Sequence, residues 1–410
     1  MRTDLVPAAE ALSIILQGAE PAGEEMIAIA EAAGRVLSRD LTALRTQPPF
    51  PSSAMDGFAV RGADIASVPV RLELIGESAA GKAFSGSLAG GQAVRIFTGA
   101  PVPQGADTVV MQENTRAEPG GVTVLVPAVT GKSVRQAGLD FRRGDVLLCA
   151  GFVLDPQRLS LAASMNHAAV PVWRKPLVAI ASTGNELRLP GAEPDPDQII
   201  ASNAFGLAAI VRRAGGDILD LGIVRDDRVA LAEAFTHALE SGADLLVTLG
   251  GASVGDHDLV LPVLRELGAK FHFSKIALRP GKPLLAGQIG HDGRIVRILG
   301  LAGNPVSSLV AGNVFVAPLV AAMAGSASSR TQEVSAVLGC DLPANDDRRD
   351  YLRASARRKS DGQLEVTPFD VQDSSMLAAL VRADALLVRP AGAGPARAGD
   401  PCPVILLREV

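Results

Sequence analysis

The chain has 410 residues and a formal net charge of −5. At about 150 residues per domain, this length predicts roughly two to four domains. The negative charge argues against a general nucleic-acid or anionic-membrane surface, although a local cationic pocket is compatible with it. The three cysteines contain no CxxC pair and are too few for a disulfide framework or a structural zinc site, which predicts buried thiols in a reducing compartment.

The N-terminal segment shows no sign of export. Residues 8–17 form an amphipathic run without the continuous apolar core of a signal peptide. The most apolar stretch, residues 306–324, is interrupted by polar residues and a proline, which favours a buried or interface helix over a membrane span. We therefore expect a cytoplasmic protein that binds neither membrane nor nucleic acid.

A helical lead-in is expected over residues 1–44. Apolar residues recur at helical spacing in residues 11–15 and 27–33, which predicts two short helices. Residues 142–176 contain a further helical run and are expected to return and pack on this lead-in.

Two segments have the sequence pattern of β domains. Residues 45–141 contain short apolar runs separated by Gly, Pro and Asp turns. Residues 327–410 show the same pattern, which predicts a small β-barrel or sandwich. The expected strands are residues 70–75, 92–97, 108–112 and 122–126, then 333–338, 351–356, 364–367, 385–388 and 404–407.

Strands and helices alternate regularly over residues 177–326, which predicts an open α/β sheet. The chain is thus expected to be a multidomain α/β plus β protein. Ligands of open parallel sheets bind beyond the carboxyl ends of the strands, so the loops that leave the strands are the first candidates for a site. The expected strands are residues 177–181, 218–223 and 244–249, and the expected helices are residues 203–214, 229–239 and 259–267.

Four loops leave the expected strands at one edge of this sheet. The loop 250–258 begins with two glycines, which let backbone N–H groups approach an anion beside a helix N-terminus. By itself, a Gly-Gly turn after a strand is more often a tight connection. The other three loops are residues 182–186, 225–227 and 303–308.

Three acidic residues, Glu186, Asp226 and Asp258, come from three of these loops. Carboxylates that converge beside phosphates suit a hard cation such as Mg²⁺. Taken singly, Asp226 and Asp258 are as well explained as helix N-caps, and Glu186 as a solvated residue.

Two cations, Lys275 and Arg279, alternate with apolar residues and would project on one face of a strand. Such a pair can bind an oxyanion, whereas an edge strand guarded by charges is the alternative. The rigid turn that follows carries Lys282 between two prolines and favours binding. In the β-rich segment, Asp56 precedes a glycine, so a structural turn is the default interpretation there.

A series of motifs resembles one known family, the molybdopterin molybdenumtransferases of MoeA type, shared with the C-terminal region of gephyrin. The series covers about residues 45 to 310 and is far more specific than any one motif. The sequence departs from the family pattern at Arg279, where Lys is common, and at Phe58, Ala302 and Asp373. The motifs are residues 53–60, 97–103, 138–140, 182–187, 249–258, 279–283 and 303–307.

The resemblance implies an elongated homodimer of four-domain subunits. Residues 1–44 and 142–176 would form its dimerisation domain, and the active site would lie between the α/β domain of one subunit and the β-rich domain of the other. Molybdopterin adenylyltransferase and molybdoenzyme maturation proteins would be its partners.

The resemblance also implies residue roles. Asp56, Thr98 and Asp140 would reach the site from the partner subunit, Glu186, Asp226 and Asp258 would hold Mg²⁺, and Lys275, Arg279 and Lys282 would bind molybdate or the terminal phosphate. Further substrate-binding residues would be Thr183, Gly184, Gly250, Gly251, Ser253, Gly255, Gly303, Asn304, Pro305 and Ser374.

The implied reaction inserts molybdenum from molybdate into adenylated molybdopterin, with Mg²⁺-dependent hydrolysis that releases AMP. Two alternatives compete with it. One is the related adenylyltransferase, which is an α/β domain alone and does not explain residues 1–175. The other is a scaffold or pterin-binding module, which would tolerate loss of the acids and cations named above.

Overall fold

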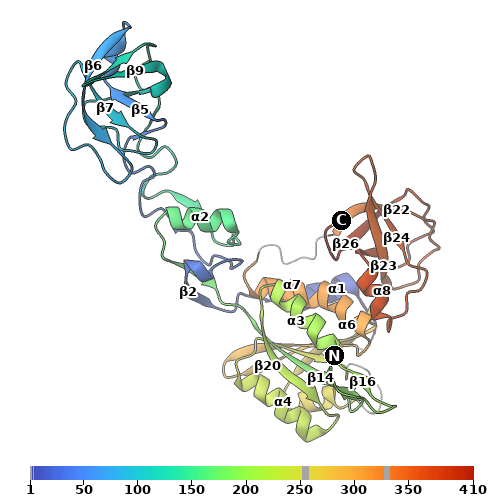
Figure 1. Ribbon diagram of the computed structural model, residues 1–410. Helices are drawn as coiled ribbons and strands as arrows, with labels where there is room; N and C mark the ends of the chain where they lie inside the picture. The colour runs from blue at the N-terminus through green and yellow to red at the C-terminus, as the bar shows by residue number, and fades with distance from the viewer. Residues whose placement is uncertain (1, 3, 252–257, 327–332) are drawn as a thin grey trace.

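A computed structural model describes residues 2, 4–251, 258–326 and 333–410. The molecule is elongated (Figure 1). The β-rich domain lies at one end, the α/β domain and the C-terminal barrel lie together at the other, and a small connecting domain that carries β2 and α2 lies between them.

The connecting domain is built from chain on both sides of the β-rich domain. β2 (Glu24–Ala28) pairs antiparallel with β13 (Ala169–Trp173), and α2 (Pro156–Ser164) packs on the segment that follows β2. The helix expected at residues 27–33 is wrong, because this stretch forms the end of β2 and a short 3₁₀ turn, η1 (Ile29–Glu31). Pairing with the buried strand β13 overrides the helical spacing of a short apolar run.

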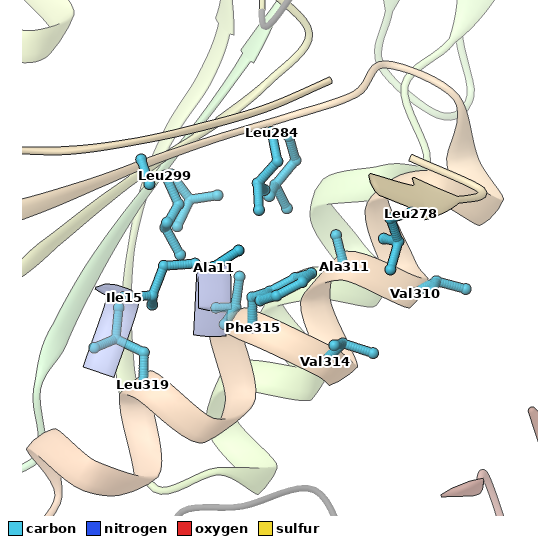
Figure 2. Packing of buried hydrophobic residues seen from close by; sticks show 14 of the residues in the cluster. Ala11, Ile15, Leu278, Leu284, Leu299, Val310, Ala311, Val314, Phe315 and Leu319 are labelled. Carbon is cyan, nitrogen blue, oxygen red and sulfur yellow. The ribbon is translucent and has the colours of Figure 1, made fainter. Parts of the chain in front are cut away.

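The first helix, α1 (Ala8–Leu16), packs on the α/β domain, although the sequence groups it with the rest of residues 1–44. Figure 2 shows Ala11 and Ile15 of this helix beside Phe315 and Leu319 in the core. Arg297, from the central sheet, donates to the carbonyl oxygen of Ile15 at 3.0 Å and closes the end of the helix. Burial lowers the pKa of this guanidinium.

Alternate residues of β14 (Leu177–Thr183) point into different hydrophobic cores on the two faces of the α/β sheet. The strand order is β17-β14-β18-β21-β20-β19, and the first four strands run parallel. The expected strands and helices are therefore confirmed to within a few residues. The bounds are β17 (Asp217–Val224), β18 (Leu245–Leu249), β21 (Arg294–Leu301), β20 (Pro283–His291) and β19 (Lys270–Arg279), with α3 (Asn203–Arg213), α6 (Pro305–Ala311), η4 (Gly312–Val316) and α7 (Ala317–Met323) on one face and α4 (Arg228–Glu240) and α5 (Val260–Glu266) on the other.

The most apolar stretch of the chain is a core element. Residues Pro305–Met323 are long and apolar enough to cross a membrane, but 72% of this window is buried against the α/β sheet and its neighbours. The prediction of a buried helix agrees with this packing.

The β-rich domain is a six-stranded sheet of order β8-β5-β7-β6-β10-β9. The four expected strands are present, and β5 and β9 were not expected. The bounds are β5 (Gly57–Val60), β6 (Val70–Ser78), β7 (Gln92–Ile96), β8 (Thr108–Met111), β9 (Thr115–Glu118) and β10 (Gly121–Val124).

The C-terminal domain is a closed five-stranded barrel, in which each strand pairs with two others of the same set. This closure decides between the barrel and the sandwich that the sequence allows. A parallel pairing of Leu278 with Arg349 and of Arg279 with Asp350 joins the barrel to the α/β sheet. The bounds are β22 (Glu333–Leu338), β23 (Arg349–Arg358), β24 (Leu364–Pro368), β25 (Ala385–Arg389) and β26 (Pro401–Leu406), with α8 (Leu377–Arg382) alongside.

The cysteines fit the expectation of buried thiols only in part. Cys402 is buried in the barrel core, and burial raises its pKa to about 11. Cys340 is half-buried, whereas Cys149 is exposed.

One carboxylate ties the connecting domain to the α/β domain. Asp244 accepts hydrogen bonds from Nη1 and Nη2 of Arg174 at 3.0 and 2.8 Å and from the backbone N–H of Leu177 at 2.7 Å. The same guanidinium donates to the carbonyl oxygen of Ala22. The Asp244 side chain is only 13% exposed, so these bonds are largely shielded from water.

We expect Asp244→Asn to lower the free energy of unfolding by about 2 kcal/mol, because it removes a charge-assisted bidentate pair from a mostly buried position. The melting temperature of the full chain should fall by roughly 2–3 °C. The matched control is Asp217→Asn, because Asp217 and Lys175 form an ion pair at 3.5 Å with both side chains well exposed. This control should shift the melting temperature by less than about 1 °C. Equal shifts for the two variants would contradict the assignment.

Candidate functional site

A cavity of about 850 Å³ lies where the strands of the α/β sheet end and the barrel begins. The strands β14, β17, β18 and β21 send loops into it, as expected for the carboxyl edge of an open sheet. Its lining includes the expected residues Thr183, Gly184, Glu186, Asp226, Gly250, Gly251, Arg279, Lys282, Gly303, Asn304, Pro305 and Ser374.

The two glycines after β18 are required by the backbone. Gly250 and Gly251 have φ angles of +96° and +62°, a backbone region that residues other than glycine rarely adopt. A Cβ on Gly250 would lie 2.7 Å from the carbonyl oxygen of Thr183, and one on Gly251 would lie 2.2 Å from Val260 Cγ2. The main chain therefore passes close to Thr183 at the floor of the cavity. The expected residues Ser253 and Gly255 lie outside the described residues.

Two of the three expected acids, Glu186 and Asp226, line the cavity. The pKa of Asp226 is raised, first by partial burial and then by the Glu186 carboxylate, against a hydrogen bond from the backbone of Asn185 that lowers it. The helix-cap alternative does not apply to Asp226, because the neighbouring Asp227 caps α4 through bonds of 3.0 Å to two backbone N–H groups.

Asp258, the third expected acid, does not line the cavity. Its Oδ1 accepts a hydrogen bond of 3.1 Å from the backbone N–H of Val260, the first residue of α5, although the N-cap position itself is Leu259. Among the described residues, no group of three His, Cys, Asp or Glu side chains is placed to hold a metal ion. The pair of Glu186 and Asp226 nevertheless suits Mg²⁺, which commonly binds one or two carboxylates and completes its shell with water and phosphate.

The cations near the end of β19 differ in their surroundings. Arg279 and Lys282 line the cavity, whereas Lys275 lies on the same strand but outside the lining. Arg279 forms ion pairs with Asp346 and, at 3.3 Å, with Asp350. The edge-strand alternative is wrong, because β19 is paired on both sides, with β20 and with β1 (Val6–Pro7) and β23.

The barrel supplies one wall of the cavity. Ser374 Oγ accepts a hydrogen bond of 2.9 Å from Asn304, and the carbonyl oxygen of Ser374 accepts one of 3.1 Å from the N–H of Val306. Arg353, which is 1% exposed, donates at 3.0 Å to the carbonyl oxygen of Asp373 and so supports the loop that carries Ser374.

Asn203 and Arg348 are among the lining residues that the sequence did not point to. Asn203 donates at 2.7 Å to the carbonyl oxygen of Gly303, and Arg348 enters from the barrel. Asn203 was detectable as the first residue of an expected helix next to the site. Arg348 had no comparable signal, because a pattern of short strands does not show which barrel loop faces another domain.

Asp56, Thr98 and Asp140 are not brought to this cavity by their own chain. Asp56 and Thr98 adjoin β5 and β7 at the opposite end of the molecule (Figure 1), and Asp140 directly precedes Phe141 of the connecting-domain core. Asp56 Oδ1 accepts hydrogen bonds from the N–H and the hydroxyl of Thr98 at 2.7 and 2.8 Å, and these bonds lower its pKa. Both side chains are exposed, and so is Asp140.

Family profiles match three successive parts of the chain. Residues 6–166 match the "MoeA N-terminal region (domain I and II)", residues 179–322 match the "Probable molybdopterin binding domain", and residues 335–407 match the "MoeA C-terminal region (domain IV)".

Similar proteins cover nearly the whole chain. A molybdopterin molybdenumtransferase of Nostoc sp. is 37% identical over 373 residues, which span 90% of this chain and 85% of that protein. One of Haemophilus influenzae is 35% identical over 382 residues, 93% of each chain. Two solved structures of the molybdopterin biosynthesis moeA protein from Pyrococcus horikoshii have TM-scores of 0.83 and 0.81 at 30% and 27% identity, and they cover 99% and 98% of this chain and 100% of each of those chains.

The raised pKa of Asp226 predicts a pH-dependent effect on stability. Folding disfavours the ionised form of Asp226. The resulting loss of folding stability is absent below the ordinary pKa of 3.8 and appears as the pH rises through the raised pKa. We expect Asp226→Asn to raise the melting temperature by about 1–2 °C at pH 7.5, and this gain should shrink as the pH falls toward 3.8.

The control for this measurement is Glu193→Gln, which removes the same charge from an exposed position. Melting curves of both variants and the wild type over this pH range test the assignment. A gain for Asp226→Asn that is independent of pH, or an equal gain for the control, would refute it.

Proposed function

Because this chain belongs to the molybdopterin molybdenumtransferase family of MoeA type, an enzyme family of molybdenum cofactor biosynthesis, we propose that it inserts molybdenum from molybdate into adenylated molybdopterin and releases AMP. The observation that carries this proposal is the cavity itself. It combines the carboxylates of Glu186 and Asp226 with the cations Arg279 and Lys282 at the carboxyl edge of one sheet.

On this proposal, the carboxylate side of the cavity handles the phosphoanhydride. Glu186 and Asp226 would hold Mg²⁺, with Asp258 adjacent at the start of α5, and the ion would neutralise charge on the phosphate oxygens. Backbone N–H groups of Gly250 and Gly251 would orient the same phosphates. Water attacks the phosphoanhydride, and AMP leaves.

The remaining expected substrate-binding residues come from two neighbouring loops. Thr183 ends β14 and Gly184 follows it, and residues 303–305 follow β21, so both loops border the glycine turn. Ser374 would orient the substrate from the barrel side through its bond with Asn304.

The cationic side of the cavity would position the oxyanion. Arg279 and Lys282 would bind molybdate or the terminal phosphate of the pterin, with Lys275 nearby on the same strand. The two dithiolene thiols would then bond to molybdenum, and their two protons would leave with one oxygen of the molybdate as water. Fixed cations suit this step because they hold a tetrahedral dianion in one place while its ligands are exchanged.

We also propose that the working enzyme is a cytoplasmic homodimer whose partner subunit completes the site. Asp56, Thr98 and Asp140 would approach the cavity of the other subunit, which would explain an exposed and pre-oriented carboxylate so far from the cavity of its own chain. Molybdopterin adenylyltransferase would supply the adenylated substrate, and molybdoenzyme maturation proteins would receive the product.

The two alternatives find less support. An adenylyltransferase alone does not explain the matches over residues 6–166 and 335–407. A scaffold does not explain why acids and cations share one cavity with a turn whose backbone requires glycine.

We expect molybdate-dependent AMP release from adenylated molybdopterin by the wild type only when Mg²⁺ is present. Glu186→Gln should lower the rate about 100-fold, because it removes one of the two carboxylates proposed to hold the ion. The measurement is AMP formed per minute, with and without molybdate and Mg²⁺. Glu193→Gln, an exposed charge-matched change, should keep wild-type activity. Adenylated pterin that binds but never turns over would favour the binding-module alternative.

Mixing two inactive variants tests the shared site. Dimers of Asp56→Ala and Glu186→Ala subunits should recover about a quarter of the wild-type rate, because half of randomly formed dimers are mixed and one of their two sites is intact. Mixtures of Glu186→Ala and Asp226→Ala subunits should recover nothing, because both changes damage the cavity of their own chain. Absence of recovery in the first mixture would reject the shared site.

A further inference from the structure

Two guanidinium groups converge on one carboxylate beside the cavity. Asp346 Oδ2 accepts a hydrogen bond from Arg279 and another, at 3.0 Å, from Nη2 of Arg348. Both arginines line the cavity, whereas Asp346 does not. A pair of guanidiniums at the wall of a cavity is the arrangement that recognises phosphate-like oxyanions.

The two arginines come from different domains. Arg279 is the last residue of β19, and Arg348 directly precedes β23, where the α/β sheet and the barrel are joined by the pairing of Arg279 with Asp350. The strand pairing therefore fixes the distance between the backbone positions that carry the two side chains. Their guanidinium groups meet only through Asp346.

The cluster is neutral overall, and its hydrogen bonding is incomplete. Asp350, which is 4% exposed, is the second carboxylate on Arg279, at 3.3 Å. Nε of Arg279 and Oδ1 of Asp350 are buried without a hydrogen-bond partner. A planar guanidinium can contact both carboxylates at once, which an ammonium in its place would do with poorer geometry. The charge of the two guanidiniums is thus cancelled by the protein's own carboxylates.

For Asp346 to leave this cluster, its side chain must give up the two guanidinium bonds and a bond of 2.9 Å that its Oδ1 accepts from the backbone N–H of Arg348, whereas its main chain is held separately. Its backbone N–H donates to Asn345 Oδ1 at 3.0 Å, and its carbonyl oxygen accepts from the N–H of Gly392 at 2.6 Å. Its side chain is 43% exposed, and those of Arg279 and Arg348 are 41% and 30% exposed. Ion pairs this open to water are weak, so a dianion can compete with the carboxylate.

We propose that Arg279 and Arg348 form one oxyanion site and that Asp346 is an internal carboxylate that occupies it until a tetrahedral dianion replaces it. This inference rests on the proposed function, for which molybdate is that dianion. Asp346 then sets the affinity for the oxyanion, and Arg348 is a second cation that the barrel contributes. Lys282 differs from both arginines, because it forms no ion pair within the described part of the chain.

The test is titration calorimetry with sodium molybdate on the purified full-length chain. Asp346→Asn should lower the Kd about tenfold, because it frees both guanidiniums and removes a competing charge. Arg348→Gln should raise the Kd about tenfold, because it removes a cation from the site. The matched control is Asp347→Asn, since Asp347 carries the same charge one residue further along and forms no ion pair in the described residues. Its Kd should change by no more than about twofold.

The opposite signs for Asp346→Asn and Arg348→Gln distinguish this site from a structural salt bridge, which both variants would weaken alike. Melting curves run in parallel identify a variant whose Kd changes through loss of fold. If the wild type binds molybdate and Asp346→Asn binds it equally or less tightly, the inference is overturned while the proposed function stands. If neither protein binds molybdate, the oxyanion step of the proposed function falls with it.

Discussion

The pairing of β19 with two domains at once determines where a site can form. β19 is antiparallel to β20 within the α/β sheet, and its last two residues pair in parallel with β23 of the barrel. A backbone ladder fixes both the distance and the direction of its strands. The turn after β19 therefore faces the loops of the barrel, and the loops after β14 and β18 border the same space. The cavity has walls from two domains but a single continuous framework of strand pairs.

Much of this framework could be predicted from the sequence, because the α/β domain and both β domains depend on local periodicity. The strand at residues 177–181 and the helix at residues 203–214 are long enough for their patterns to dominate. The stretch at residues 27–33 was too short, and its pairing with β13, more than a hundred residues away, decided its structure. The docking of α1 on the α/β domain was equally hidden, because an amphipathic helix does not reveal which domain buries its apolar face.

The candidate site was predictable where it follows strand ends and unpredictable where it depends on tertiary contacts. Glu186, Asp226 and the glycine pair lie in loops that the sheet must bring together. The sequence could not show that Asp227 rather than Asp226 caps α4, because adjacent aspartates offer the same side chain to the helix. It also could not show that Arg279 is held by carboxylates of the barrel, since that pairing joins residues more than sixty positions apart.

The β-rich domain carries an oriented carboxylate, Asp56, that lies far from the cavity of its own chain. Asp56 is held by two hydrogen bonds from Thr98, which lower its pKa. Such bonds orient a carboxylate that is already fully exposed, where solvation alone would satisfy it. Orientation without burial leaves a carboxylate ready to meet a ligand or another surface. The connecting domain keeps this group far from the cavity of its own chain (Figure 1), and in the homodimer that we propose the surface that it meets is the cavity of the partner subunit.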